Sequence, residues 1–394
     1  MPASSTDWRR TATSPTAPDP GTSGRLISLD VFRGATVAGM LLVNDPGSWG
    51  HIYPPLRHAA WHGWTPTDLV FPFFLFIVGV TTHLSLSARR ARGATERELL
   101  RQVLRRALVI VLLGLLLSAF PFFPAERLAH LRIPGVLQRI GVVYLVTGLL
   151  VLRTSARTQT AVAAVLLLGY WMLLVLVPVP GVGPAALAPP EATLPAWVDR
   201  LLLSGHLWDQ TKTWDPEGPL STLPAIASCL LGVGAGRWIT RLLPLAERIN
   251  GLFAAGAIGL LLGSIWNWVF PINKNLWTSS YVLFTGGMAC VALATCMWLI
   301  EERRSTWWTR PFVVFGVNPI VAFAGAEATA RLIYSVIEVP CAGDTVPLQT
   351  ALYRSLFAPW LPPEAASLAF ALAFVAVWYV LLDLLYRRRV ILKI

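Results

Sequence analysis

Long apolar stretches, separated by short polar or charged segments, run along the chain from residue 26 to its C-terminal end. Each stretch is near-continuous over about 20 residues, the length of an α-helix that crosses a bilayer. Barrel strands would instead alternate apolar and polar positions over about 10 residues. The pattern therefore predicts an all-α, polytopic transmembrane helix bundle of about 10 helices, with a range of 10 to 11. The predicted spans are residues 26–45, 67–88, 107–123, 134–152, 159–177, 221–238, 251–270, 277–300, 311–333 and 366–386.

The composition fits a chain that lies mostly in lipid. Of the 394 residues, 55% are hydrophobic and only 13% are charged, against about 25% charged in a soluble domain. A net charge of +11 would suggest nucleic acid as the partner of a soluble chain, but basic residues in a membrane protein mark cytoplasmic loops. We therefore expect the lipid bilayer, and no nucleic acid, as a partner.

The cysteines predict neither a disulfide framework nor a zinc site, because they form no CxxC pair and have no histidine nearby. We expect no metal in this protein. The cysteines are Cys229, Cys290, Cys296 and Cys341.

The distribution of basic residues predicts the orientation of the bundle. One set of connecting segments holds 22 of the 32 Lys and Arg residues, and the opposite loops hold 7. The richer side should be cytoplasmic, so both termini are predicted to be cytoplasmic, and the chain is expected to be a multi-pass protein of the inner (cytoplasmic) membrane. Residues 1–24 are polar and lack an apolar core, which predicts a disordered cytoplasmic tail before a transmembrane domain at 25–394.

Ionisable groups inside spans are costly and therefore mark pairs or binding sites. Asp30 and Arg33 in the first span are three residues apart, so they share a helix face and either neutralise each other or engage a charged ligand. Arg139 lies in the outer half of the fourth span. Lys274 occupies a very short outer turn, where it either holds a phosphate or extends toward the membrane surface. Asn318 precedes Pro319 in the ninth span.

Histidines concentrate after the first span. Three of the six fall within twelve positions, at His51, His58 and His62, between Asn44 at the end of the span and Asp68. An imidazole can take a proton from an incoming nucleophile, while an amide or a carboxylate can orient it or stabilise developing charge. The alternative is that these loop histidines are inert; a metal site is disfavoured because the spacings of seven and four lack a helical context.

Five ordered sequence blocks resemble one known family, the heparan-α-glucosaminide N-acetyltransferases and their bacterial relatives. The likeness covers about residues 25–394. The blocks are RLISLDVFRG (25–34), HAAWHGWT (58–65) running into DLVFP (68–72), RIPGVLQRI (132–140), DPEG (215–218) with STLPAI (221–226), and NKNLWTSSY (273–281).

The resemblance implies an acyltransferase that takes acetyl-CoA, as co-substrate, from the cytoplasmic side. It implies acetylation of an amino sugar such as a terminal glucosamine on the outer side, which for a bacterial chain would belong to an envelope glycan. The family's catalytic histidine matches His58 and its asparagine matches Asn44. The chain departs from the animal enzyme in lacking a large lumenal domain before the first span, and in carrying His62 after Trp61.

The residues expected to carry this function fall into three groups. For catalysis we expect His58, Asn44 and Asp68; for binding acetyl-CoA, Arg33, Arg139, Lys274 and Asn318; and for binding the acceptor, His62, Asp215, Glu217 and Asn273. Either His58 acts as a base in a ternary complex, which we favour, or it is itself acetylated.

Two other classes of function remain open from the sequence. A secondary transporter or a flippase for a glycan or lipid-linked sugar would also have about ten spans and buried charges. A structural subunit of an envelope-synthesis complex would need no catalytic histidine. The chain can also be expected to form a homodimer.

Overall fold

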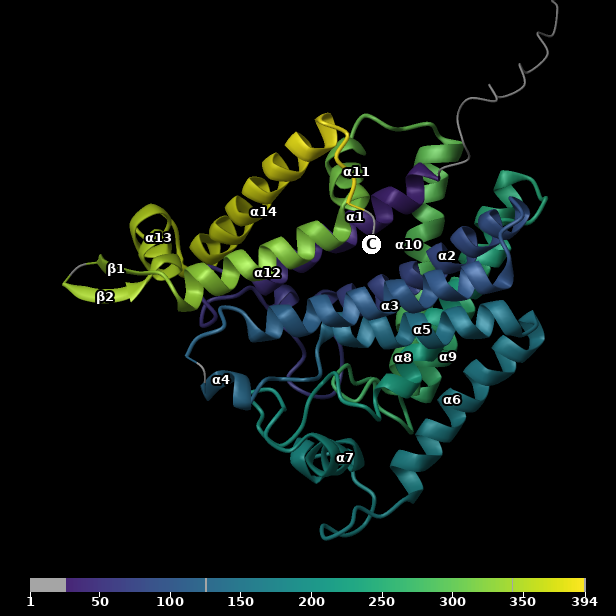
Figure 1. The fold of residues 1–394 in the computed structure, drawn as a ribbon, viewed down its shortest axis with the longest axis horizontal. Coiled ribbons are helices and arrows are strands. Elements are labelled where there is room, and N and C mark those ends of the chain that lie inside the picture. The colour runs from purple at the N-terminus through teal and green to yellow at the C-terminus, as the bar shows by residue number, and fades with distance from the viewer. Residues whose placement is uncertain (1–25, 125, 342, 393–394) are drawn as a thin grey trace, which may run out of the picture.

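The computed structural model describes residues 26–124, 126–341 and 343–392. Within these residues, nine helices are long and apolar enough to cross a membrane, and a bent pair of helices makes a tenth candidate span. The predicted transmembrane helix bundle is therefore confirmed (Figure 1). The predicted tail at residues 1–24 lies outside the described residues, and the cytoplasmic orientation of the termini stays a prediction.

The ten candidate spans follow the predicted order. They are α1 (Ile27–Asn44), η2 with α2 (Pro66–Leu69 and Val70–Ala91), α3 (Glu96–Ala119), α5 (Val136–Arg153), α6 (Ala156–Leu176), α8 (Thr222–Ile239), α9 (Leu245–Trp266), α10 with the π-helical turn η4 (Ser279–Met297 and Trp298–Glu302), α11 with α12 (Arg310–Val317 and Pro319–Ser335) and α14 (Pro363–Arg387).

The third span begins earlier than predicted. Helix α3 begins at Glu96, whereas the apolar pattern predicted residue 107. Thr95 and Glu98 form a capping box, in which the Thr95 side chain accepts from the Glu98 amide and the Glu98 carboxylate accepts from the Thr95 amide. This cap starts the helix within the arginine-rich segment, so the basic residues of 97–106 lie on a helix and not on a loop.

The ninth span is broken, which corrects the prediction of one helix over 311–333. Helices α11 and α12 meet at an angle of 83° around Asn318. Pro319 has no backbone N–H and its ring excludes the preceding residue from helical geometry, so Asn318 has φ −121° and ψ 53°. The break places the Asn318 side chain inside the bundle, where it is buried.

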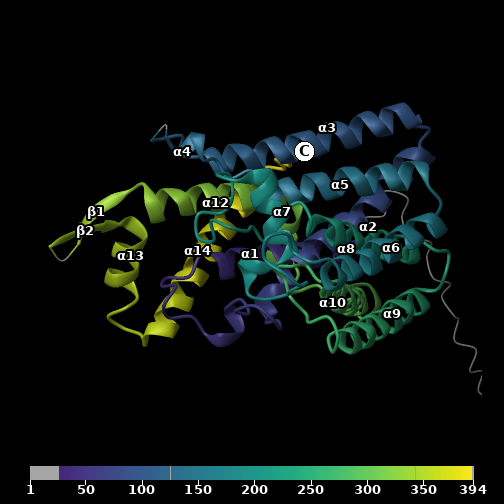
Figure 2. The same cartoon turned by 90° about the horizontal axis from the view of Figure 1, so that it is seen from below.

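Several short elements outside the spans were not predicted. They include helices α4 (Glu126–Ala129) and α7 (Leu194–Leu203) and an antiparallel hairpin of β1 (Glu338–Cys341) and β2 (Asp344–Pro347), in which Glu338 pairs with Pro347. Helix α13 (Leu348–Leu356) follows the hairpin directly. Figures 1 and 2 show the hairpin and α13 projecting from one end of the bundle, beyond α12.

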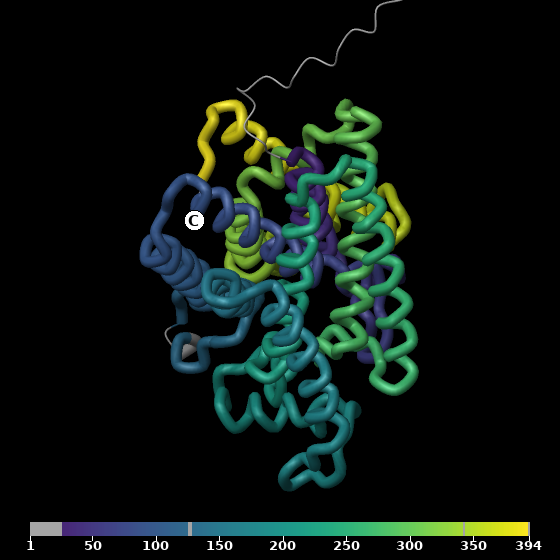
Figure 3. Tube along the Cα trace, turned by 90° about the vertical axis from the view of Figure 1, so that its right-hand side faces the viewer, coloured from purple at the N-terminus to yellow at the C-terminus, as the bar shows by residue number. Residues whose placement is uncertain are grey.

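Close helix crossings at glycines hold the centre of the bundle together. A Cβ added at Gly79 of α2 would lie 2.0 Å from the Cys229 carbonyl oxygen of α8, and one at Gly232 of α8 would lie 2.0 Å from that of Phe76. Small residues let two backbones approach in this way and gain packing contacts that lipid cannot replace. Helices α9 and α10 also lie side by side (Figure 3).

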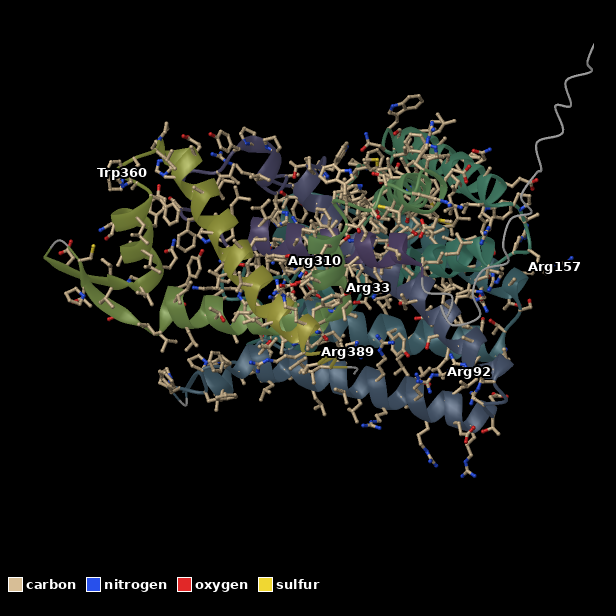
Figure 4. The ribbon with its side chains drawn as sticks, turned by 90° about the horizontal axis from the view of Figure 1, so that it is seen from above. Arg33, Arg92, Arg157, Arg310, Trp360 and Arg389 are labelled. Atoms are coloured by element: carbon tan, nitrogen blue, oxygen red, sulfur yellow. The ribbon has the colours of Figure 1, made fainter. Side chains whose placement is uncertain are left out.

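The two ends of the bundle differ in character. We call one the arginine-rich end; it comprises residues 89–97, 153–157, 237–248 and 301–310. The other, the loop end, comprises residues 51–66, 178–221, 271–278 and 336–362. Figure 4 shows Arg92 and Arg157 at the arginine-rich end and Trp360 at the opposite end. Helix α2 runs from the loop end to the arginine-rich end.

Candidate active site

An aspartate and a histidine form a close pair at the loop end. His58 Nδ1 lies 2.6 Å from Asp68 Oδ1, the Asp68 side chain is 1% exposed and the His58 side chain is 45% exposed. Because the Asp68 carboxylate accepts a hydrogen bond from Nδ1, the imidazole holds its proton there, and Nε2 carries the lone pair that can accept a proton. The pair thus combines a buried orienting carboxylate with an accessible base.

The local sequence explains how Asp68 is held. Thr65 caps the 3₁₀ turn η2, Pro66 occupies its first position, and Asp68 is the third residue of a capping box. Asp68 Oδ2 accepts from the amides of Ala59 and Thr65, each at 3.0 Å, and from the Thr65 hydroxyl at 3.2 Å. Only an ionised carboxylate can accept from all these donors together with His58.

Lys274 reaches this pair from a turn between α9 and α10. Its Nζ lies 3.1 Å from His58 Nδ1, 3.3 Å from His58 Nε2 and 3.8 Å from Asp68 Oδ1. A nitrogen atom that lay in the ring plane at 3.1 Å from Nδ1 and 3.3 Å from Nε2 would overlap the ring carbons. The Lys274 ammonium therefore lies against the face of the imidazole. Burial lowers the pKa of Lys274, while the charges of Asp68 and Glu217 oppose this shift.

The turn that carries Lys274 is built by Asn273, whose side chain is fully buried. Asn273 Oδ1 accepts from the Leu276 amide at 2.8 Å, and the Thr278 amide donates to the Asn273 carbonyl at 3.1 Å. Trp277 adopts φ +53°, an unusual value for a bulky residue, which is held by its tight packing. The Lys274 backbone is thus fixed.

His62 joins the same turn. The Asn273 amide nitrogen lies 3.4 Å from His62 Nδ1 and donates to it, and burial lowers the pKa of His62. The histidine loop is further anchored by the Gly63 amide, which donates to the Ile272 carbonyl at 2.7 Å, and by Trp61 Nε1, which donates to the Leu187 carbonyl at 2.8 Å. The geometry therefore favours a neutral His62 in a supporting position beside His58.

A second charged cluster at the loop end is centred on Arg132. Its guanidinium donates to both oxygens of Asp215, at 2.7 and 2.8 Å, and to Glu217 Oε2 at 2.5 Å. Burial alone would lower the pKa of Arg132, but the hydrogen bonds to Asp215 and the charge of Glu217 raise it. The Asp215 side chain has no exposed surface, so its position favours support of Arg132 over contact with a substrate.

Asp199 of α7 completes this cluster. Its Oδ2 accepts from the Asp215 amide at 2.9 Å. Burial raises the pKa of Asp199 to about 7, although that hydrogen bond acts in the opposite direction. Asp199 and Arg132 were not among the predicted site residues; Arg132 lay in one of the five sequence blocks, but nothing in the sequence pointed to Asp199.

Arg139 is buried at the centre of the loop end. It donates to the Gly218 carbonyl at 3.2 Å and to the Ser221 hydroxyl, and its Cζ lies 5.1 Å from the Trp277 ring centroid. Two of its nitrogens, Nε and Nη1, are buried without a hydrogen-bond partner in the described part of the chain. Its predicted contact with acetyl-CoA is untested, and this position favours a role in joining the loops.

A cavity of about 610 Å³ lies inside the bundle. It follows one face of α2 from Phe71 to the C-cap residue Arg92, which is roughly 30 Å of helix. One end reaches Phe71, three residues after Asp68. The lining residues from α2 and its C-cap are Phe71, Phe74, Ile77, Val78, Thr81, Ser85, Ala88, Arg89 and the C-cap residue Arg92.

Arginines surround the other end of this cavity. Arg89 of α2, Arg92 at the C-cap of α2 and Arg106 of α3 line it, and none of them forms an ion pair with a carboxylate within the described ranges. The Arg106 Cζ lies 5.0 Å from the Tyr144 ring centroid, and its Nε has no partner among described residues. These arginines had been used only to predict orientation. The sequence did not show that these arginines line a cavity.

Arg33 also lines the cavity, as Asp30 does. Arg33 Nη1 lies 3.2 Å from Asp30 Oδ1 and donates to the Gly316 carbonyl at 3.0 Å. Figure 4 shows Arg33 near the middle of the molecule. The structure thus combines the two alternatives for this pair, because the ions neutralise each other and still face a cavity.

Asn318 binds the C-terminal segment of the chain. Its Nδ2 donates to the Val390 carbonyl and its Oδ1 accepts from the Leu392 amide, both at 3.0 Å. After α14 the chain turns back toward the middle of the bundle (Figure 1), and Ile391 and Leu392 line the cavity. The predicted contact of Asn318 with acetyl-CoA is untested, and its amide already holds a cavity wall.

Asn44 lies at the end of α1, before the loop that carries the His58–Asp68 pair. Its side chain is exposed at the end of α1, and it makes no hydrogen bond to His58 or Asp68 within the described residues. Its catalytic role stays a prediction. Among the residues that the structure describes, no group of three or more His, Cys, Asp and Glu side chains could hold a metal ion.

The fold and this site define a multi-pass membrane protein with a histidine–aspartate pair at the loop end of the bundle and an internal cavity that runs along α2 from Phe71 to arginines at the other end. The family described as "Heparan-alpha-glucosaminide N-acetyltransferase, catalytic" matches residues 25–255. The chain belongs to this family of membrane acetyltransferases.

Two mammalian proteins, both described as heparan-alpha-glucosaminide N-acetyltransferase, are similar to the chain. The human protein is 31% identical over 372 residues, which cover 81% of this chain and 54% of the human protein. The mouse protein is 30% identical over 358 residues, which cover 77% of this chain and 54% of the mouse protein. The chain thus spans about half the length of these relatives.

Proposed function

We propose that this protein transfers the acetyl group of acetyl-CoA to the amino group of an amino sugar, with His58 as the general base. The observation that supports this most directly is the cavity, which extends from Phe71, three positions after Asp68 in the sequence, to three arginines that form no ion pair with a carboxylate in the described part of the chain. The arginines would bind the phosphates of acetyl-CoA, and the apolar wall along α2 would hold its long thioester arm. A second support is membership of the acetyltransferase family.

The reaction follows from the geometry of the pair. The acceptor nitrogen attacks the thioester carbon, forming an N–C bond while its proton passes to His58 Nε2. The C–S bond then breaks, and the proton held on His58 Nε2 passes to the CoA sulfur, so that CoA leaves as a thiol and the imidazole is neutral again. Asp68 orients the imidazole and stabilises its charged form, and the Lys274 ammonium stabilises negative charge on the carbonyl oxygen.

The proposal includes sidedness, because the two ends of the site differ. Acetyl-CoA would enter at the arginine-rich end, which the charge bias predicts to be cytoplasmic, and the acceptor at the loop end. The acceptor would then be an extracytoplasmic glycan of a bacterial envelope, and the protein would work in the cytoplasmic membrane. Direct attack in a ternary complex needs no acetylated His58. A homodimer remains a prediction.

The test uses the purified protein in detergent with acetyl-CoA labelled in its acetyl group and glucosamine as the acceptor. We expect labelled N-acetylglucosamine and free CoA thiol in equal amounts. Label that stays on the protein without acceptor would favour an acetyl-histidine intermediate. Acetyl-CoA that is neither bound nor cleaved would overturn the proposal in favour of a transporter.

Arg106→Gln should weaken acetyl-CoA binding by about tenfold or more, because a charge-assisted hydrogen bond to phosphate contributes about 1.5–3 kcal/mol. Isothermal titration calorimetry in detergent measures the Kd. The control is Arg105→Gln, because Arg105 is the neighbouring residue of α3 but lines a separate surface groove. Equal affinity of the two variants would show that the cavity mouth does not hold the phosphates.

Lys274→Met should move the acid limb of the kcat/KM profile to higher pH. The ammonium against the His58 ring opposes a second positive charge, so its removal makes the imidazole easier to protonate and the base is lost at a higher pH. Lys274→Arg keeps the positive charge and should leave the acid limb in place. If Lys274→Met leaves the pH profile unchanged, the ammonium does not act on the His58 ring.

A further inference from the structure

A second polar groove lies at the arginine-rich end, on the outer surface between α6 and the end of α8. It encloses about 580 Å³, and four of its nine lining residues come from α8 and the turn after it. Figure 4 shows Arg157 of this groove at the extremity of the bundle and separate from Arg92 at the cavity mouth. The lining residues are Ala156, Arg157, Thr160, Ala161, Ala164, Gly234, Arg237, Trp238 and Arg241.

The charges in this groove are unbalanced. Arg157, Arg237 and Arg241 converge on it from two helices, whereas none of its lining residues is acidic. None of these three arginines forms an ion pair with a carboxylate in the described part of the chain. Three cations that face one volume without a counter-ion favour an anionic ligand with several acceptor oxygens.

Two contacts hold the polar wall in place. The Arg241 Cζ lies 4.6 Å from the Trp238 ring centroid, and Trp238 Nε1 donates to the Arg248 carbonyl at 2.9 Å. Arg237 donates one hydrogen bond, to Gln159 Oε1 at 2.5 Å. Since a guanidinium has five N–H donors, Arg237 retains donors for a ligand.

The other side of the groove is small and apolar. Ala161, Ala164 and Gly234 are exposed, and a Cβ added at Gly234 would meet no atom within 4 Å. Farther along α6, which is a candidate membrane span, Val165 and Leu168 are 69% and 48% exposed. The site is therefore polar at the bilayer boundary and apolar where acyl chains lie.

We propose that this α6–α8 groove binds an anionic phospholipid. The phosphate lies between Arg157, Arg237 and Arg241, and an acyl chain follows Ala161, Ala164 and Gly234. A soluble phosphate compound such as acetyl-CoA matches the arginines but leaves the lipid-facing apolar side unused. Basic pockets between transmembrane helices bind anionic lipid head groups for this reason. The site is separate from the proposed reaction and does not depend on it.

The test is native mass spectrometry of the full chain in detergent with added phosphatidylglycerol or phosphatidylcholine. We expect at least fivefold more bound phosphatidylglycerol. The double variant Arg157→Gln/Arg241→Gln should reduce this adduct about tenfold or more, since each basic residue near a membrane surface contributes to attraction of anionic lipid. The matched control is Arg303→Gln/Arg304→Gln, which removes two charges at the same end, including Arg303, whose Cζ stacks 5.0 Å from Trp298.

A third variant separates lipid from free phosphate. Gly234→Leu keeps all three arginines and fills the apolar side, so it should also remove the phosphatidylglycerol adduct. Competition with acetyl-CoA should leave that adduct in place. Equal binding of the two lipids, an adduct that survives both groove variants, or displacement by acetyl-CoA would overturn the proposal.

Discussion

His58→Ala is expected to lower acetyl transfer by at least 10²-fold and up to 10⁴-fold, while insertion into the membrane and thermal stability stay close to wild type. The imidazole of His58 is 45% exposed, whereas the Asp68 side chain is 1% exposed, so the substitution removes the proposed base but little packing. The measurement is the initial rate of N-acetylglucosamine formation at saturating acetyl-CoA, with the thermal midpoint of each preparation.

His62→Ala is the matched control for this prediction. His62 is four residues away on the same loop, and it contacts Asn273 and not Asp68. Its loss should lower the rate less. If His58→Ala retains more than about a tenth of wild-type turnover, or if the order of the two variants is reversed, His58 is not the general base.

Arg132→Met is expected to destabilise the protein by about 3 kcal/mol or more, because removing one partner of a buried ion pair leaves uncompensated charge. The side chains left behind are those of Asp215, with no exposed surface, and Glu217, which is 9% exposed. Methionine preserves most of the side-chain volume, so lost packing is a minor part of the effect. The measurement is unfolding in mixed detergent micelles, followed by tryptophan fluorescence.

Arg153→Met provides the comparison for an exposed pair. Arg153 and Glu96 lie 3.7 Å apart with side chains 60% and 62% exposed, so their loss should change stability by less than about 1 kcal/mol. The triple variant Arg132→Met/Asp215→Asn/Glu217→Gln removes all three charges, so it should recover much of the stability that Arg132→Met loses. Equal destabilisation by Arg132→Met and Arg153→Met would contradict the account of the cluster.

The spans could be predicted because crossing a bilayer is a property of local length and polarity. The first span was predicted at 26–45 and is α1 at Ile27–Asn44. The errors came where a local rule was overlooked or tertiary packing intervened. The Thr95 capping box could have been read as the start of α3, whereas the 83° bend at Asn318 also depends on the C-terminal segment that packs there.

Some contacts of the candidate site could be predicted from the local sequence, and others could not. His58 and Asp68 are ten residues apart, and the intervening Thr65-Pro66 turn signal brings them together, so their proximity followed from a short motif. Lys274 is 216 residues from His58, and Asp215 is 83 residues from Arg132. No local pattern encodes such distances, since they depend on which helices cross and at what depth.

The sequence by itself determined that the protein is a multi-pass helical membrane protein, that a histidine-rich loop follows its first span, and to which family it belongs. Hydrophobic length and ordered motifs could show this because they are properties of adjacent residues. Only the tertiary structure decided that Lys274 lies on the His58 ring, that Arg139 is buried against Trp277, and that Arg106 lines a cavity leading toward Asp68. Helix packing creates these juxtapositions, because close crossings at residues such as Gly79 set which side chains share a volume.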